Sequence, residues 1–311
     1  MGRGARPGPR RSRGAPAQPR GRVPGPHRGT PRGRVVTVSS AGAAPPTAEG
    51  NAAAALRLTF HQAHYDLLAF FRNRQSRFFT LALPVLFLVI FASVFGGSNH
   101  VAVPGGKIKT SVYYVPGIMA LGIIAASFVN LVISVTVQRE SGVLKRRRAT
   151  PIAAGSVIAA RVVTAIVTAL LITGVLLTLG WLIYRAHVPG RTAPALVVTV
   201  MLGAAVFCCL GYALTSVIHN DEAAQPITQA VMLPLYFISG VFVPSSILPH
   251  WLVDVANIFP VKHLAAALLT AYNPFTRGAG FSGGDLLVLA AWGIGGLAVA
   301  LRRFSWLPIR R

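Results

Sequence analysis

Residues 116–151 read "PGIMALGIIAASFVNLVISVTVQRESGVLKRRRATP" and place a long apolar run directly before a short charged segment. The apolar part, near 116–137, contains no charged residue and is long enough to cross a bilayer as a helix, which takes about 20 residues. The segment that follows, 138–151, carries six charges in fourteen residues. Because another apolar run begins near residue 162, the stretch predicts two membrane-spanning helices joined by a charged connector.

Further long apolar runs occur on both sides of this stretch. Of its 311 residues 53% are hydrophobic and only 12% are charged, about half the charged fraction of a soluble domain. The predicted fold is therefore all-α: a polytopic membrane protein with six transmembrane helices, an N-terminal interfacial helix, and a re-entrant or interfacial helical segment between the fifth and sixth spans. The spans are expected near 78–95, 116–137, 162–184, 195–218, 226–243 and 285–301.

Residues 1–55 form a separate region, a basic tail rich in Arg, Pro and Gly. Ten of the 30 basic residues are arginines within residues 1–34, and the first acidic residue is Glu49. Such a tail buries too little to offset its ordering entropy, so we expect it to be disordered. It lacks the apolar core of a signal peptide. It is either an arm that touches anionic lipid or RNA, or a solvated stretch, with a true start near Val36 or Val38 as a further possibility.

Residues 56–76 predict an amphipathic helix, and residues 77–311 the transmembrane domain. The apolar stripe of this helix has helical spacing and consists of Leu56, Phe60, Ala63, Leu67 and Phe71. Polar residues lie off the stripe: Arg57, Gln62, Asp66, Arg72 and Asn73. The run is too polar to cross a bilayer, which favours a helix in the cytoplasmic interface, with packing on other protein as the alternative.

Lys and Arg in the short flanking segments predict the orientation. One side of a six-span arrangement collects most of them: Arg72, Arg74, Arg77, Arg139, residues 145–148, Arg302, Arg303, Arg310 and Arg311. The other side has Lys107, Lys109, Arg185, Arg191, Lys262 and Arg277. The connector "HNDEAAQ", 219–225, has neither Lys nor Arg and does not support the rule. The bias predicts a multi-pass protein of the plasma membrane with both termini in the cytoplasm.

The segment between the fifth and sixth spans is apolar but broken by Pro244, Pro249 and Pro260. Each piece is too short to span, so the segment predicts two short helices on or in the outer leaflet, with Trp251 at the interface. Irregular backbone at this depth needs protein or water around it. We therefore expect the segment to cap or line the outer face.

The connector 138–151 is predicted to have a defined structure and not to be a flexible loop. Its basic residues help to fix the orientation, but that role leaves Glu140, Gly142 and the final "ATP" unexplained. Pro151 suits the first turn of a helix and Thr150 can cap it. The connector therefore predicts a short charged helix, a corner and a new helix.

These residues resemble the membrane subunits of ATP-binding-cassette exporters of the second type, the permeases of drug-resistance, antibiotic-export and polysaccharide-export systems. The first match is a Pro-Gly that opens the second span, followed by the connector motif: Pro116, Gly117, Arg139, Glu140, Gly142, Leu144, Lys145, Arg146, Thr150 and Pro151. The second follows the fifth span: Ser239, Gly240, Pro244, Leu248, Pro249, Trp251 and Pro260. The resemblance covers about residues 56–303 and excludes the tail.

The resemblance implies that the connector is a coupling helix that docks on an ATPase subunit. The chain itself has no phosphate-binding G-x-x-x-x-G-K-[ST] loop: in "VAVPGGKI", 101–108, Val101 and Ile108 replace the required Gly and hydroxyl residue. The ATPase, with its ATP and Mg²⁺, is therefore expected in another chain. Six spans make half a transporter, so a homodimer or a heterodimer with a second permease is expected.

No catalytic or metal-binding set is expected in this chain. The eight His residues are scattered, and His61 and His64 have no third ligand near them in the sequence. Cys208 and Cys209 are neighbours in an apolar run and are predicted to be small buried side chains.

Polar residues inside the spans are candidates for a transport path, which the resemblance places between the second and fifth spans of two protomers. They are Ser127, Asn130 and Ser134 on the second span, and Thr228, Gln229 and Ser239 on the fifth. The alternative is that they only hold helices together. No ionisable group is expected in the middle of a span, and sparse hydroxyls in an apolar path suit an amphipathic or lipid-like cargo, such as a drug, an antibiotic or a glycolipid.

The competing hypotheses are a secondary transporter or channel that uses no ATP, and a membrane-anchored nucleic-acid binder. The first needs an inverted repeat or buried charges, and the sequence shows neither. The second depends on the tail alone, so no nucleic-acid partner is expected.

Overall fold

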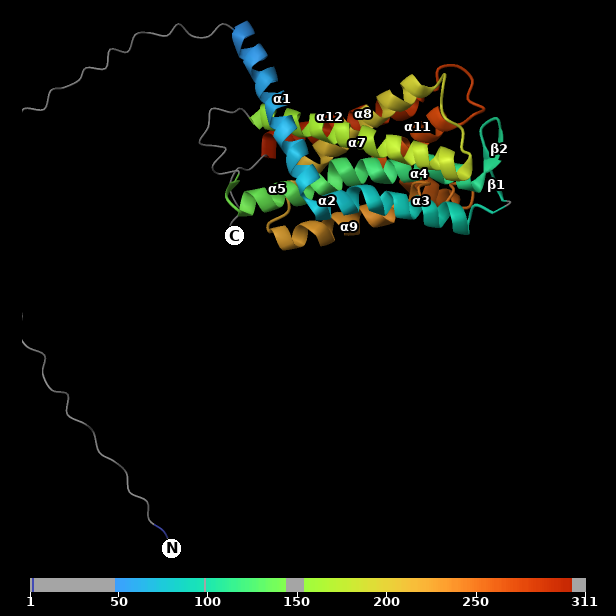
Figure 1. The fold of residues 1–311 in the computed structure, drawn as a ribbon, viewed down its shortest axis with the longest axis horizontal. Coiled ribbons are helices and arrows are strands. Elements are labelled where there is room, and N and C mark those ends of the chain that lie inside the picture. Colours follow the sequence, from blue (N-terminus) through green and yellow to red (C-terminus); the bar gives the residue numbers. More distant parts are fainter. Residues whose placement is uncertain (1, 3–47, 98, 144–153, 304–311) are drawn as a thin grey trace, which may run out of the picture. The chain divides into compact units, whose positions relative to one another are not determined.

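The computed structural model of the protein describes residues 2, 48–97, 99–143 and 154–303. The chain divides into two units, residues 1–46 and 47–311, and every element described below belongs to the second. That unit is mostly helical, as the apolar patterning predicts (Figure 1). Most of the predicted tail, 1–55, lies outside the described residues, but residues 48–55 are helical and not disordered as predicted.

The N-terminal helix is longer than predicted and buries a different face. Helix α1 runs over Ala48–Arg72, and after Asn73 a short helix α2 covers Arg74–Arg77. The residues that α1 buries are Thr59, Ala63, Asp66 and Phe70. Phe60 and Phe71 of the predicted stripe are exposed instead. One face of α1 therefore packs against α7, which was the alternative, and an apolar face remains exposed. A position of this helix in the membrane interface stays a prediction.

The main helices follow in the predicted order. They are α3 (Leu83–Val94), preceded by a π-helical turn η1 (Phe78–Ala82); α4 (Thr110–Ile124), η2 (Ala125–Val129) and α5 (Asn130–Glu140), which together form one helix; α7 (Ala154–Tyr184); α8 (Ala193–Thr215); α9 (Asp221–Ile238); and α12 (Gly283–Arg303).

Four of these helices are long and apolar enough to cross a bilayer by themselves: residues 110–140, 155–184, 193–215 and 283–303. A fifth candidate is a bent pair, α10 (His250–Ala256) and α11 (Pro260–Tyr272). The predicted first span corresponds to a shorter apolar helix, residues 80–94, and α9 does not meet the same criterion. The described residues therefore give four to five candidate spans.

Helices α10 and α11 occupy the proline-broken segment and meet at 97°. Pro249 directly precedes α10 and Pro260 is the first residue of α11. Proline is tolerated at these positions because the first N–H groups of a helix have no partner within it. The segment is tied to α12 by His263, whose Nδ1 lies 2.7 Å from Oδ1 of Asp285.

A β-hairpin departs from the all-α prediction. Strands β1 (His100–Val103) and β2 (Gly106–Lys109) pair antiparallel, with Val103 opposite Gly106 across the turn. Pro104 and Gly105 form the turn, and Gly105 has a φ of +91°, a conformation that glycine adopts without strain. The Pro-Gly pair between alternating residues was the sequence signal for this hairpin.

Helix α4 is the centre of the fold. All but one of its fifteen residues are buried, and α3, α7 and α11 pack around it. Cys208 and Cys209 of α8 are buried and free, as predicted. In Figure 1 the end of α5 and the start of α9 lie at one end of this unit, which we call the connector end; β1 and β2 lie at the opposite, hairpin end.

Candidate functional site

Arg139, the first residue of the connector motif, is buried at the connector end, with 2% of its side chain exposed. Its Nη1 donates a hydrogen bond to the carbonyl oxygen of Thr215, at 2.9 Å, and its Nη2 donates to that of Ile218. Thr215 is the last residue of α8, where carbonyl groups lack helical partners. A guanidinium with several donors satisfies these carbonyls, so Arg139 fixes the end of α5 to the end of α8.

Glu140, the next residue, makes a second tie. Its Oε1 accepts a hydrogen bond from the backbone N–H of Asp221, at 3.1 Å, in the first turn of α9. A carboxylate is favourable there because of the free N–H groups and the helix dipole. Asn220 caps the same helix by accepting from the N–H of Ala223, at 3.1 Å. The start of the connector is therefore attached to both α8 and α9.

The rest of the connector motif is described only in part. Gly142 has a φ of +73°, which marks the turn that ends α5. Leu144, Lys145, Arg146, Thr150 and Pro151 lie outside the described residues.

A cavity of about 440 Å³, here called the α3–α9 cavity, lies between η1–α3, η2–α5 and α9. Most of its lining is apolar and includes Phe87, Val129, Ile133 and Phe242. Amide side chains interrupt this lining: Asn73, Asn130, Gln225 and Gln229. An apolar cavity with a few polar groups is the usual form of a site for a small amphipathic molecule.

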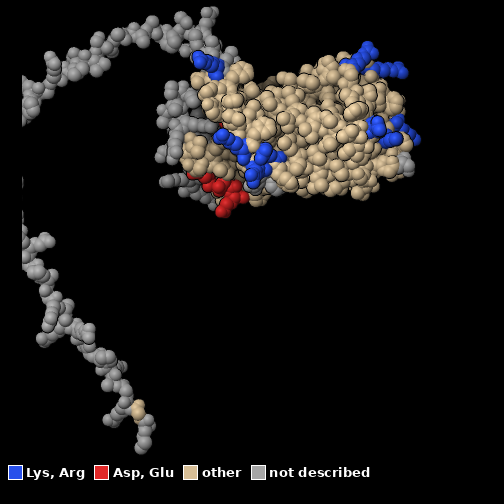
Figure 2. All heavy atoms as spheres, viewed as in Figure 1, with Lys and Arg blue, Asp and Glu red and all other residues tan. Residues whose placement is uncertain are grey.

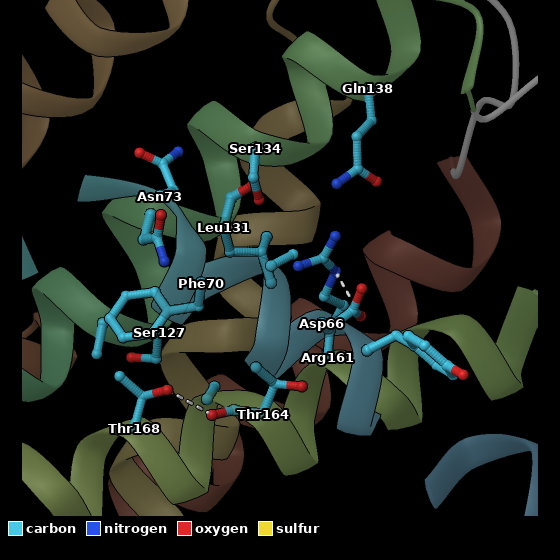
Figure 3. A pocket seen from close by; sticks show the side chains of 15 residues that line it. Asp66, Phe70, Asn73, Ser127, Leu131, Ser134, Gln138, Arg161, Thr164 and Thr168 are labelled. Atoms are coloured by element: carbon cyan, nitrogen blue, oxygen red, sulfur yellow. Dashed lines mark hydrogen bonds and ion pairs between the residues drawn. The ribbon is translucent and has the colours of Figure 1, made fainter. Parts of the chain in front are cut away.

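A second cavity, of about 280 Å³, lies between α1, η2–α5 and α7 and is called the α1–α7 cavity (Figure 3). Its wall holds an ion pair, in which Nε of Arg161 lies 3.3 Å from Oδ2 of Asp66. Arg161 lies well inside α7, because this helix begins earlier than the predicted third span. The hydroxyl residues around the hollow are Ser127, Ser134, Thr164 and Thr168.

The structure does not bring the six predicted path residues together in one site. Ser127 and Ser134 line the α1–α7 cavity, Asn130 lines both cavities, and Gln229 lines the α3–α9 cavity. Thr228 is fully buried and donates its hydroxyl proton to the carbonyl oxygen of Ala224. Ser239 is buried at the hairpin end, next to Tyr113 and Lys262 in a small pocket of about 60 Å³.

The segment after α9 is held to its neighbours by polar contacts. The hydroxyl of Tyr113 donates to the carbonyl oxygen of Gly240, at 3.2 Å, and Nζ of Lys262 donates to Oγ of Ser245, at 2.6 Å. Pro244 is buried in this corner, whereas Trp251 of α10 is 66% exposed. The second sequence motif therefore forms a corner packed on α4 and α11, followed by an exposed aromatic side chain.

Charged residues gather at the two ends of the described unit, and between them the face in Figure 2 shows a broad region without Lys, Arg, Asp or Glu. Exposed basic residues include Arg72 and Arg74 near the connector end and Lys107 and Arg185 toward the hairpin end. An uncharged band between charged ends is the pattern of a protein embedded in a bilayer.

Sequence reasoning missed several residues of both cavities. Asp66 was placed only among the polar residues off the apolar stripe, and Arg161 was not singled out. A usable signal was present, since Arg161, Thr164 and Thr168 recur at i, i+3 and i+7 and share one face of α7. The aromatic residues of the α3–α9 cavity, Phe87, Tyr236 and Phe242, come from distant segments and had no such signal.

Comparison with known proteins identifies the family of this chain. Residues 60–272 match the family described as ABC-2 type transporter. A relative, the daunorubicin resistance ABC transporter permease protein DrrB1 of Streptomyces coeruleorubidus, is 25% identical over 244 residues, which are 76% of this chain and 80% of that protein. The match covers both cavities and the start of the connector. The chain belongs to the ABC-2 type transporter family and is a membrane permease subunit.

Proposed function

We propose that this chain is the membrane subunit of an exporter that moves an amphipathic or lipid-like cargo out of the cell, powered by a separate ATPase subunit that binds ATP and Mg²⁺. The permease itself catalyses no reaction in this proposal. Its task is to change shape when the ATPase pushes on the connector 138–151. The family and the drug-resistance relative support this assignment.

The observation that carries the proposal is the double attachment of the connector. Arg139 holds the end of α8, and Glu140 holds the first turn of α9. Helix α9 supplies Gln225, Gln229 and Tyr236 to the α3–α9 cavity. A force applied to the connector is therefore passed to α9, a wall of the cavity, through the Glu140 link, while the Arg139 link holds the end of α5 to the end of α8.

The α3–α9 cavity is the proposed cargo path. It lies between the helices that the sequence assigns to the second and fifth spans, where a second protomer would complete it. Its mostly apolar lining suits the apolar part of an amphiphile better than an ion. We therefore expect the working unit to contain two permease chains, identical or related, and two ATPase subunits.

The proposed membrane arrangement has six spans and both termini in the cytoplasm. Helix α3 and its preceding turn form the first span, and α9 forms the fifth. Contacts with the second permease chain cover the polar positions of α9. The connector end then faces the ATPase, and the β-hairpin and the pair α10–α11 face outward.

Reconstitution with the ATPase subunit tests the proposal. We expect Glu140→Ala to lower transport per ATP hydrolysed by roughly threefold or more, because the tie to α9 is lost, while the ATPase still co-purifies. We expect Arg146→Glu to weaken co-purification itself by charge reversal. The measurements are ATP hydrolysis, cargo uptake into inverted vesicles and the amount of ATPase bound.

Asp254→Ala, an exposed acidic residue on α10, is the matched control and should leave all three measurements unchanged. Normal coupling and normal ATPase binding in both connector variants would contradict the proposed role of the connector. Transport that persists without any ATPase would instead favour a secondary transporter or channel.

A further inference from the structure

The α1–α7 cavity differs in chemistry from the α3–α9 cavity beside it. Ten of its fifteen lining residues are polar, against six of fifteen in the other cavity. The helix η2–α5 lies between the two cavities, and a different face of it lines each one. Ser127, Ser134 and Gln138 point to one cavity, whereas Val129, Ile133 and Val137 line the other. The two cavities adjoin at Asn73 and Asn130, which line both.

The hydroxyl groups of the α1–α7 cavity are arranged as acceptors. Ser127 donates its proton to the carbonyl oxygen of Ile123, at 2.5 Å, and Ser134 donates to that of Leu131, at 3.2 Å. Thr164 and Thr168 donate to the carbonyl oxygens of Ala160 and Thr164, at 2.9 and 2.8 Å. A hydroxyl has one proton, so each oxygen keeps lone pairs. Ser127 is fully buried, so the acceptors offered to a ligand are those of Ser134, Thr164 and Thr168.

Donors are also present, but the charges cancel. Arg161 meets Asp66 through Nε, and its terminal nitrogens make no hydrogen bond to other described residues. Oδ1 of Asp66 accepts from Nε2 of Gln62, at 3.2 Å. A headgroup with a single charge would have to compete with this largely buried pair, which is unfavourable. A neutral group that both donates and accepts fits the wall without disturbing the pair.

The volume limits the size of such a group. About 280 Å³ lies near the lower limit of ligand pockets, which hold roughly 300–1,000 Å³, so the cavity suits a headgroup and not a whole drug-sized molecule. The apolar remainder of the ligand has a place in the adjoining α3–α9 cavity.

We propose that the α1–α7 cavity binds a neutral, polyhydroxylated headgroup, such as a hexose, of an amphiphile whose apolar part occupies the α3–α9 cavity. This inference deepens the proposed export function and rests on it for its biological meaning. It assigns the polar half of the cargo to α1, α5 and α7, and the apolar half to α3, α5 and α9.

Photolabelling of the full chain in lipid nanodiscs, without any ATPase, tests the site. The probe is a dodecyl β-glucoside with a diazirine on the alkyl carbons next to the sugar, and labelled residues are mapped by mass spectrometry. We expect labels where the two cavities meet, around Asn73 and Asn130, because the labelled carbons join the sugar to the alkyl chain. Unlabelled dodecyl glucoside should compete at least tenfold better than dodecyltrimethylammonium or dodecyl sulfate, which share its chain.

Two threonines of α7 supply a matched pair of variants. Thr168 lines the cavity, whereas Thr178 is exposed elsewhere on the same helix, and both donate to the carbonyl oxygen four residues earlier, at 2.8 Å. We expect Thr168→Val to lower labelling by roughly three- to tenfold, the effect of one neutral hydrogen bond, and Thr178→Val to leave it unchanged. Ser134→Ala, at a half-buried position on α5, should act like Thr168→Val.

Equal competition by the three headgroups would overturn the proposal, and so would labelling that Thr168→Val and Ser134→Ala leave unchanged. Because no ATPase is present, a negative result here leaves ATP-driven export untouched. Conversely, a failure of ATP-driven transport leaves the labelling result valid as evidence of binding.

Discussion

Arg139 shows how one side chain serves both the fold and the connector. It resembles a docking residue in the sequence, yet in the structure its guanidinium is buried against one carbonyl group in the last residue of α8 and another just after that helix. Any role in coupling is therefore indirect, through the position of α5. Glu140, which is exposed, remains within reach of a partner while it holds α9.

We expect Arg139→Ala to destabilise the permease by about 2–4 kcal/mol, because two charge-assisted hydrogen bonds are lost and two carbonyl groups are left without their donor. Cys208 and Cys209 are buried and free, so their reaction with a thiol-reactive dye during heating reports unfolding. The midpoint should fall by several degrees, and less for Arg139→Lys, which keeps the charge. Arg302→Ala, at an exposed position, is the control, and an equal midpoint in both alanine variants would refute this role.

Single residues also show where sequence reasoning reaches its limit. The common face of Ser127 and Ser134 followed from helical spacing, because both belong to one helix. The burial of Asp66 did not follow, because its partner Arg161 lies on a helix far along the chain. A lone acidic residue on an amphipathic helix normally faces solvent, and only the packing of α1 on α7 reverses that expectation.

At the scale of elements, the Pro-Gly pair in α4 explains a close contact. A Cβ atom at Gly117 would lie 2.8 Å from the carbonyl oxygen of Val241, in the corner after α9. That neighbour is backbone and cannot move aside as a flexible side chain can. The glycine therefore allows α4 to pack directly against this corner.

We expect Gly117→Ala to destabilise the permease by about 1–3 kcal/mol, the usual effect of overpacking. Gly174 of α7 is the matched control, since a Cβ there meets nothing within 4 Å. Gly174→Ala should be neutral or stabilise by up to about 1 kcal/mol, because alanine favours the helix. Thermal unfolding of both variants measures the difference. An unchanged unfolding midpoint for Gly117→Ala would contradict the prediction, because it would mean that the backbone after α9 moves to accommodate the added methyl group.

The elements that sequence patterns predicted best are those with a local cause. Prolines placed the starts of α10 and α11, and long apolar runs placed α4–α5, α7, α8 and α12. The hairpin was missed although Pro104 and Gly105 marked its turn, because strands of four residues are too short to be recognised by alternation alone. The separation of the six polar residues, four on two cavities, Thr228 buried inside α9 and Ser239 in the corner after α9, depends on packing between distant helices, which no local pattern contains.

At the scale of the whole molecule, orientation in the membrane is the property on which the exporter proposal depends. We expect a membrane-impermeant maleimide to label Lys107→Cys in intact cells, and Ser141→Cys only after permeabilisation, because the hairpin is predicted outside and the connector inside. The native Cys208 and Cys209 are buried and add little background. Labelling of Ser141→Cys in intact cells would reverse the orientation and separate the connector from a cytoplasmic ATPase.

The central claim is that the connector transmits conformational change from the ATPase subunit to the permease. The links from Arg139 and Glu140 to α8 and α9 are useful only if the segment after them is stiff enough to pass on a force. A flexible segment of equal length would still allow both subunits to bind ATP and cargo, but it would transmit little.

The most direct test is ATP-driven cargo uptake into inverted vesicles that contain the permease and its ATPase, with residues 144–150 replaced by glycine and serine. The account predicts that uptake falls to the level measured without ATP, while the thermal unfolding of the permease stays close to that of the natural chain. Uptake at the natural rate by this variant would contradict the claim that the connector drives the movement of α8 and α9.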